Sequence, residues 1–265
     1  MPKVRVDIWA DIACPWCYVG KRHLEQALDR FPHRDGVEIV WRSFEQEPMA
    51  PRIRDASDSY VEQLARSYRT QLPQAQAMID HMVDTAAEVG LELRFDRVRG
   101  GNTFDAHRLL HLARERGRQH ALEDRLRRAY HTEGQAIGDR EVLAALAHEA
   151  GLDDAEVREV LDGDRYTADV RRDESIAREL GITGVPYFVV SGRMGVSGAQ
   201  PAEVLLGALE WGWAELRIPA PEPEAEIDPE VEPPQPEGLP PIRIEATPGL
   251  MIEATPAARV SETCI

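Results

Sequence analysis

The chain has 265 residues, 43% of them hydrophobic, and carries a formal net charge of −16. This composition can build a hydrophobic core in one or two domains. An acidic chain without a run of basic residues is a poor candidate for binding nucleic acid or an anionic membrane surface. No apolar run approaches the roughly 18 residues that a membrane-spanning helix needs.

The first residues predict a strand and not an export signal. Apolar residues alternate with polar ones at Val4, Val6 and Ile8, which is the period of a strand. The segment holds neither an apolar core of roughly 7–15 residues nor a small-residue cleavage site, so we expect a cytoplasmic protein. Thiols are kept reduced there, and a close cysteine pair favours catalysis or metal binding over a structural disulfide.

Further elements follow in chain order. A helix begins at the Cys14-Pro15-Trp16-Cys17 motif and ends near Pro32, and a second strand covers 37–44. Hydrophobic spacing then predicts helices over about 58–70, 73–89, 103–116, 120–131, 139–150 and 153–162. Asp139, Asp153 and Thr167 are the expected N-caps of three helices, the last running to Leu180. Short strands over 187–190 and 195–198 and a helix over 200–214 complete the order.

This order indicates an α/β domain in two segments, 1–54 and 167–216, interrupted by an all-helical insertion over 55–166. Residues 217–241 are rich in proline and acidic residues, which predicts an extended linker. The tail, 242–265, repeats the sequence IEATP and contains Cys264.

Cys14 and Cys17 carry the strongest chemical signal. Cys14 would lie at a helix N-terminus, where free N–H groups and the helix dipole favour a thiolate, the form that attacks a disulfide. Pro15 suits the first helical turn because its missing N–H would be unpaired there, and Trp16 offers a flat apolar surface to a substrate. Cys17, one turn later, would resolve the mixed disulfide.

Two other interpretations of the pair stay open. A zinc site usually needs four ligands; no second CxxC is present, although His107 and His111, four residues apart, would add two nitrogens. The motif could also be fortuitous. The proline and the strand–helix context favour redox chemistry, so we expect no metal.

Two more features are candidates for the same site. A proline stands directly before a predicted buried strand in Gly184-Val185-Pro186, where it could equally open an edge strand in the ordinary trans form. Asp7 and Asp11 would share one face of the first strand if the strand extends that far. Either is a candidate buried proton acceptor for Cys17 or a solvated aspartate.

Five segments together resemble one known family. Residues 11–20 (DIACPWCYVG), 42–48 (RSFEQEP), 101–109 (GNTFDAHRL), 181–188 (GITGVPYF) and 196–201 (VSGAQP) are similar to the FrnE branch of DsbA-like oxidoreductases, over about residues 3–214. The resemblance implies a thioredoxin-like fold and oxidase, reductase or isomerase activity on protein disulfides.

The resemblance also implies residue roles. Val185 and a cis Pro186 would position an extended substrate beside the CxxC motif, and Asp7 would exchange the proton of Cys17. No cofactor is implied beyond the redox-active disulfide, with a low-molecular-weight thiol as a candidate co-substrate. Protein or peptide thiols and disulfides are the expected partners.

Rival functions and the tail complete the expectations. Related isomerases and glutathione transferases act on small aromatic molecules, and a function of that kind would need Cys14 but not Cys17. A binding or chaperone-like module would need neither. Cys264 is a candidate regulatory thiol that would form a mixed disulfide with Cys14, in the same chain or across a homodimer formed through the tail. The alternative is a disordered tail with an incidental thiol.

Overall fold

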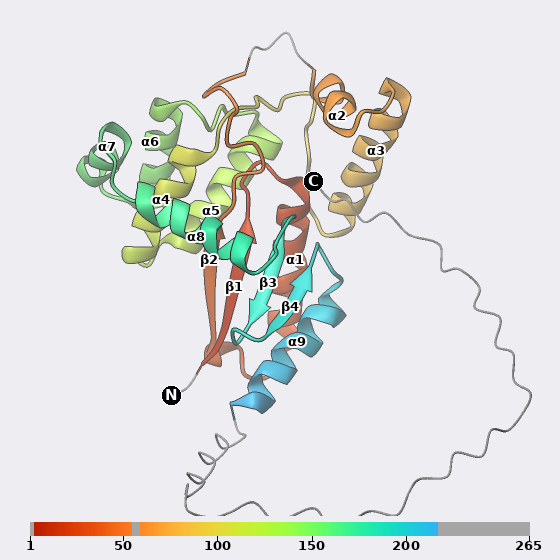
Figure 1. Ribbon diagram of the computed structural model, residues 1–265, viewed down its shortest axis with the longest axis vertical. Coiled ribbons are helices and arrows are strands. Elements are labelled where there is room, and N and C mark those ends of the chain that lie inside the picture. Colours follow the sequence, from red (N-terminus) through yellow and green to blue (C-terminus); the bar gives the residue numbers. More distant parts are fainter. Residues whose placement is uncertain (1–2, 55–58, 217–265) are drawn as a thin grey trace, which may run out of the picture. The chain divides into compact units, whose positions relative to one another are not determined.

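Residues 3–54 and 59–216 are described by the computed structural model, and a four-stranded sheet lies among them (Figure 1). The strand order is β2-β1-β3-β4. Strand β1 pairs in parallel with β2 and antiparallel with β3, which pairs antiparallel with β4. The strands are β1 (Val4–Ala10), β2 (Val37–Ser43), β3 (Tyr187–Val190) and β4 (Met194–Ser197). Both ends of the described chain therefore contribute strands to one sheet.

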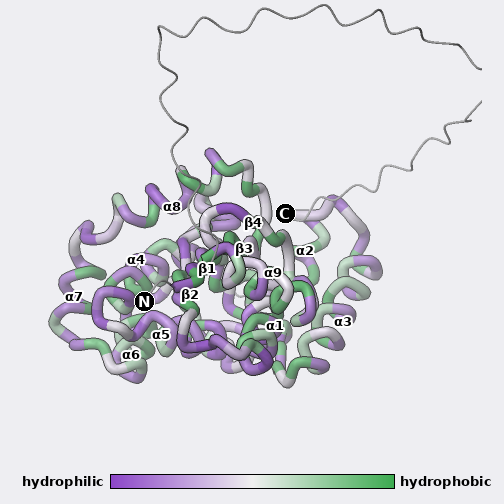
Figure 2. Tube along the Cα trace, turned by 90° about the horizontal axis from the view of Figure 1, so that it is seen from below, coloured by the Kyte–Doolittle hydropathy of each residue, from purple (hydrophilic) through white to green (hydrophobic). Residues whose placement is uncertain are grey.

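Helices cover both faces of this sheet. Figure 2 shows the strands between α8 (Thr167–Glu179) on one side and α1 (Pro15–Arg30) on the other. Helix α9 (Ala202–Glu215) packs beside α1 and against β1, β3 and β4. Gly212 permits this close approach, because a Cβ there would lie 2.7 Å from Val190 Cγ1 and 3.0 Å from Val4 Cγ1.

A short 3-10 helix (Arg34–Gly36) precedes β2. The other helices lie between β2 and α8 in the sequence and form two groups on opposite sides of α1 and β1 (Figures 1 and 2). One group packs against Tyr18 and Val19 of α1, and the other packs around Ile12. The first contains α2 (Tyr60–Tyr68) and α3 (Leu72–Glu88). The second contains α4 (Phe104–Glu115), α5 (Gln119–Arg128), a π-helical turn (Ala129–Glu133), α6 (Arg140–Glu149) and α7 (Asp154–Asp162). The segment around the two cysteines is thus held by both groups.

Of the three predicted helix N-caps, two are confirmed and one is wrong. The Asp139 side chain accepts hydrogen bonds from the N–H groups at the start of α6, and Asp153 does the same for α7. Thr167 was the wrong choice for α8: the N-cap is Tyr166, in the left-handed region with φ of 66°, and Thr167 is the first helical residue.

Some predictions fall outside the described residues. They concern the linker over 217–241, the tail over 242–265 and Cys264. No helix in the described part of the chain combines the length and the apolar character needed to cross a bilayer.

Candidate active site

Cys14 is the N-cap residue of α1, and Pro15 follows at the first helical position. Its φ of −81° and ψ of 115° are extended, so the chain turns into the helix directly at the cysteine. The Cys17 N–H donates to the Cys14 carbonyl at 3.1 Å. Cys17 is therefore one helical turn from Cys14.

The two thiols differ in acidity. Both are free and buried, Cys14 with 2% and Cys17 with 0% of its surface exposed. The hydrogen bond from the Cys17 side chain lowers the pKa of Cys14 below its ordinary value, and this effect prevails over burial. Burial, followed by the hydrogen bond and charge of Cys14, raises the pKa of Cys17 well above its ordinary value. Cys14 is thus the more acidic of the two thiols.

The Val185–Pro186 loop lies against Cys14. Its peptide bond is cis, as the resemblance implies. The Cys14 Sγ lies 3.6 Å from the Val185 carbonyl oxygen. The loop between α8 and β3 and the N-terminus of α1 are therefore adjacent.

Two buried side chains from the helices hold the turn before Cys14, and sequence reasoning did not find them. Arg127 Nη1 donates to the carbonyl oxygens of Asp11 at 2.9 Å and Cys14 at 3.4 Å. His131 Nε2 lies 3.0 Å from the Ile12 carbonyl oxygen. Since a carbonyl only accepts, Nε2 carries the proton of this neutral imidazole.

Asp11 is the acidic side chain next to the cysteines. It is 2% exposed, and its carboxylate accepts the backbone N–H of Gln46 at 2.8 Å. His107 Nε2 lies 3.5 Å from Asp11 Oδ1. Burial raises the pKa of Asp11, but the hydrogen bonds from His107, Gln46 and Thr103 outweigh it, so the pKa is lowered. Asp11 thus places a negative charge near Cys14.

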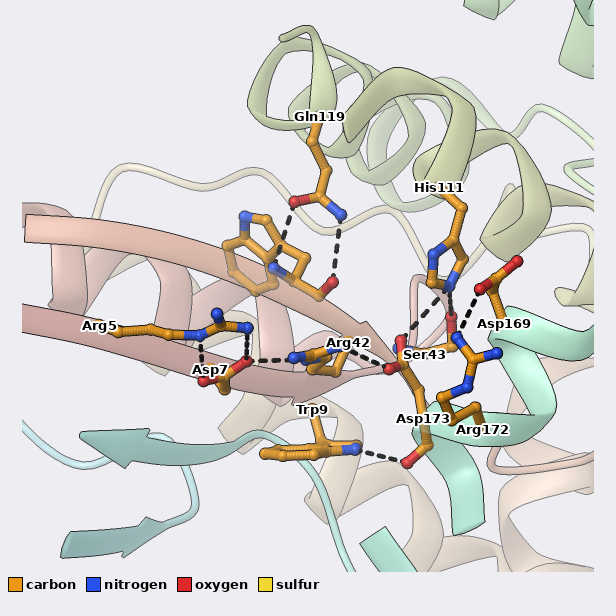
Figure 3. A network of polar contacts seen from close by, with 11 residues as sticks. Arg5, Asp7, Trp9, Arg42, Ser43, His111, Gln119, Asp169, Arg172 and Asp173 are labelled. Atoms are coloured by element: carbon orange, nitrogen blue, oxygen red, sulfur yellow. Dashed lines mark hydrogen bonds and ion pairs between the residues drawn. The ribbon is translucent and has the colours of Figure 1, made fainter. Parts of the chain in front are cut away.

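Asp7 lies in a different network, shown in Figure 3. One of its oxygens accepts from Arg5 Nε at 2.8 Å, and the other accepts from Arg42 Nε at 2.8 Å. Arg42 continues to Asp173, 2.9 Å away, which in turn lies 3.3 Å from His111. Both carboxylate oxygens of Asp7 are therefore bound by guanidinium groups, and its role as the proton acceptor of Cys17 stays a prediction.

The two candidate zinc-binding histidines bind separate carboxylates. His107 pairs with Asp11, whereas His111 pairs with Asp173 and with the Ser43 hydroxyl at 3.2 Å. Within residues 3–54 and 59–216, no three His, Cys, Asp or Glu side chains gather as metal ligands would.

A pocket of about 270 Å³ opens beside Cys14. The cysteine turn lines it with Asp11, Cys14 and Pro15. Trp16 also lines the pocket, and its ring centroid is 5.8 Å from that of His81 in α3. Much of its wall is apolar or aromatic and comes from the α2–α3 group and the π-helical turn: Tyr60, Leu64, Tyr68, Met78, Met82 and Tyr130. The polar lining includes Gln46, Glu47, Arg54 and Thr103. The Cys14 thiol therefore borders a largely apolar pocket.

The model of the DsbA-like thioredoxin domain matches residues 5–210. The chain belongs to this family. The Bacillus subtilis protein YwbO is 30% identical over 211 residues, which are 78% of this chain and 96% of YwbO. A structure described as a probable DsbA oxidoreductase from Streptomyces coelicolor is 48% identical, covers 82% of this chain and 93% of its own, and superposes with a TM-score of 0.76.

A more distant structure shares the fold. The cytosolic disulfide reductase DsbM from Pseudomonas aeruginosa, solved with GSH, is 19% identical, with a TM-score of 0.53 over 80% of this chain and 96% of its own. The prediction of a thioredoxin-like α/β fold in the DsbA-like family is confirmed. Membership and the oxidoreductase relatives support thiol–disulfide oxidoreductase activity as the general function of this DsbA-like protein.

Proposed function

We propose that this DsbA-like protein exchanges disulfides through a mixed disulfide on Cys14, which Cys17 resolves. The observation that carries the proposal is that two thiols one helical turn apart have pKa values shifted in opposite directions. The pKa of Cys14, at the N-cap of α1, is lowered, and that of Cys17 is raised. A thiolate beside a protonated partner is the arrangement that attacks first and resolves second.

In the reducing direction, the Cys14 thiolate attacks one sulfur of the substrate disulfide and the S–S bond breaks. The first substrate sulfur leaves as a thiolate and takes a proton from solvent. Cys17 then loses its proton and attacks Cys14, releasing the second substrate sulfur, which takes up that proton. The substrate gains two electrons and becomes two thiols, while Cys14 and Cys17 become a disulfide. The oxidising direction is the reverse.

The proposed substrates are protein or peptide thiols and disulfides in the cytoplasm. The Val185 carbonyl, adjacent to the Cys14 sulfur, offers an acceptor to the backbone of an extended peptide. Pro15, Trp16 and Pro186 complete the contact surface. A low-molecular-weight thiol as the second substrate would return the pair to its starting state.

The pocket favours a second candidate, catalysis on a small aromatic molecule. Its aromatic and methionine wall and its volume of about 270 Å³ suit a compact apolar ligand next to a reactive thiol. Such a reaction would use Cys14 as a nucleophile and have no need of Cys17.

Reduction of insulin by dithiothreitol tests the proposal. Cys14→Ser should abolish catalysis, and Cys17→Ser should slow turnover. Mixed with insulin in the absence of dithiothreitol, Cys17→Ser should keep a mixed disulfide that non-reducing mass spectrometry detects. Full insulin-reducing activity in Cys17→Ser would contradict resolution by Cys17, and full activity in both variants would overturn exchange through this cysteine pair.

A further inference from the structure

The guanidinium of Arg127 is buried beside the redox pair although it comes from the helical part of the chain. The residue is 1% exposed and lies near the end of α5, directly before the π-helical turn. Nη1 donates hydrogen bonds to the carbonyl oxygens of Asp11 and Cys14, which are the two ends of the turn that leads into α1. His131, four residues later, holds the Ile12 carbonyl between them. A single helical segment therefore fixes three of the four carbonyl groups from Asp11 to Cys14.

A buried arginine is costly unless its charge is compensated. Glu123, one turn earlier and also 1% exposed, binds Arg127 Nε, and Lys21 Nζ of α1 lies 3.9 Å from the same carboxylate. Lys21 is itself paired with Glu25 at 2.6 Å and Asp124 at 2.9 Å. The fold thus maintains a buried ion-pair chain that ends with a positive charge at the Cys14 carbonyl.

Two charged side chains act on the Cys14 thiolate in opposite directions. Asp11, which lines the pocket together with Cys14, disfavours the thiolate, whereas Arg127 favours it. The Arg127 charge acts on Cys17 in the same direction. Glu123 binds Nε while the Cys14 carbonyl binds Nη1, so the carboxylate lies on the other edge of the guanidinium.

We propose that Arg127 is a positioning residue of the redox site, whose charge stabilises the reduced Cys14–Cys17 pair relative to the disulfide. The inference rests on the proposed exchange function and deepens it. Stabilising a thiolate favours the reduced protein, so the pair becomes a stronger oxidant of substrate thiols. Arg127 makes the helical segment a determinant of the reduction potential.

The test uses the full-length chain in a Cys264→Ser background, so that two thiols remain. Arg127→Met removes the charge, and Arg127→Met combined with Glu123→Gln removes it without leaving an unpaired buried carboxylate. Arg127→Lys restores the charge without the paired carbonyl bonds. Arg128→Met is the matched control, because Arg128 is its exposed neighbour and binds Glu133. Two quantities are measured: the Cys14 thiolate titration at 240 nm, and the equilibrium with reduced and oxidised glutathione.

Both Met variants should raise the Cys14 titration midpoint by about one unit. The equilibrium constant for oxidation should shift up to tenfold toward the disulfide, which corresponds to about 30 mV for a two-electron couple. The titration midpoint and equilibrium constant of Arg127→Lys should be nearer to those of the parent protein. Those of Arg128→Met should equal the parent values. A folded double variant with unchanged titration and equilibrium would overturn the role of Arg127. A parent that never forms the 14–17 disulfide would instead overturn the exchange function.

Discussion

The Cys14 sulfur lies 3.6 Å from the Val185 carbonyl oxygen, although 171 positions separate the two residues. The contact forms because β1 and β3 are neighbours in the sheet, with Trp9 opposite Tyr187. The end of β1 leads into the cysteine turn, and the start of β3 follows Pro186. The sheet register therefore brings a nucleophile and a backbone acceptor to the same place.

The Cys17 side chain should control the acidity of Cys14. Its hydrogen bond is the largest cause of the lowered Cys14 pKa. Cys17→Ala removes the donor, whereas Cys17→Ser keeps one, so the Cys14 titration midpoint should rise more in the alanine variant. Equal midpoints for the two variants, measured at 240 nm, would mean that the helix N-terminus, and not the Cys17 side chain, lowers the pKa of Cys14.

Asp11 should oppose thiolate formation, and Asp7 should have no influence. Asp11→Asn removes a buried negative charge beside Cys14, so the Cys14 pKa should fall by up to about one unit. Because Asp11 accepts several hydrogen bonds, the free energy of unfolding should fall by about 1–3 kcal/mol.

Asp7→Asn is the matched control for this experiment, because Asp7 is bound by Arg5 and Arg42. It should leave the Cys14 titration unchanged. A shift in Asp7→Asn as large as that in Asp11→Asn would support the predicted role of Asp7 in the redox site.

His131 should make stability fall at mildly acidic pH. Burial, together with the Arg127 charge, lowers its pKa to about 3, so the folded protein keeps it neutral where the unfolded chain, with a pKa near 6.5, binds a proton. Stability from this group is complete above about pH 6.5 and is lost as the pH falls toward 3.

At pH 5.5 this loss should reach about 1.4 kcal/mol relative to pH 7.5, since one pKa unit corresponds to that energy. His131→Gln keeps a donor for the Ile12 carbonyl without titrating. Urea unfolding at the two pH values should show a smaller decrease in the variant by this amount. The same decrease in both proteins would mean that His131 is protonated in the folded state.

Gly20 should be essential for the approach of α1 to the Pro186 loop. A Cβ at this position would lie 3.0 Å from Pro186 Cγ and 3.4 Å from a ring carbon of Phe188. In an open helical position, glycine-to-alanine substitution gains about 0.5–1 kcal/mol. Gly207 of α9 serves as the control, because a Cβ added there would have no other atom within 4 Å.

Urea unfolding should therefore show Gly207→Ala more stable than the parent and Gly20→Ala less stable. Insulin reduction should slow in the latter, because the loop beside Cys14 must shift. Equal stabilisation by both substitutions would contradict the close packing of Gly20 against Pro186.

Local patterns in the sequence were sufficient for most of the described fold. Strand 187–190 and the caps at Asp139 and Asp153 depend on neighbouring residues, and they were predicted correctly. The Tyr166 cap was missed because it makes no side-chain hydrogen bond that a pattern could reveal. The division of the helices into two groups was also missed, since it depends on which residues of the cysteine turn and α1 each group contacts.

The sequence predicted the two cysteines of the site but not the buried side chains that surround them. Cys14 and Pro15 are adjacent in sequence and define a helix start, whereas Arg127 and His131 meet them only through tertiary packing. A signal was present: Glu123, Arg127 and His131 recur every four residues next to the apolar stripe of the predicted 120–131 helix. Asp7 was preferred to Asp11 by analogy, but the strand ends at Ala10 and the chain then turns Asp11 toward the cysteine pocket.

The most direct test is the thiolate titration of the reduced Cys264→Ser protein at 240 nm, repeated with Cys14→Ser. We expect a transition with its midpoint below the ordinary cysteine value of about 8.5, and we expect Cys14→Ser to abolish it. A protein in which no thiol ionises below that value, or in which the transition survives the loss of Cys14, would contradict the account.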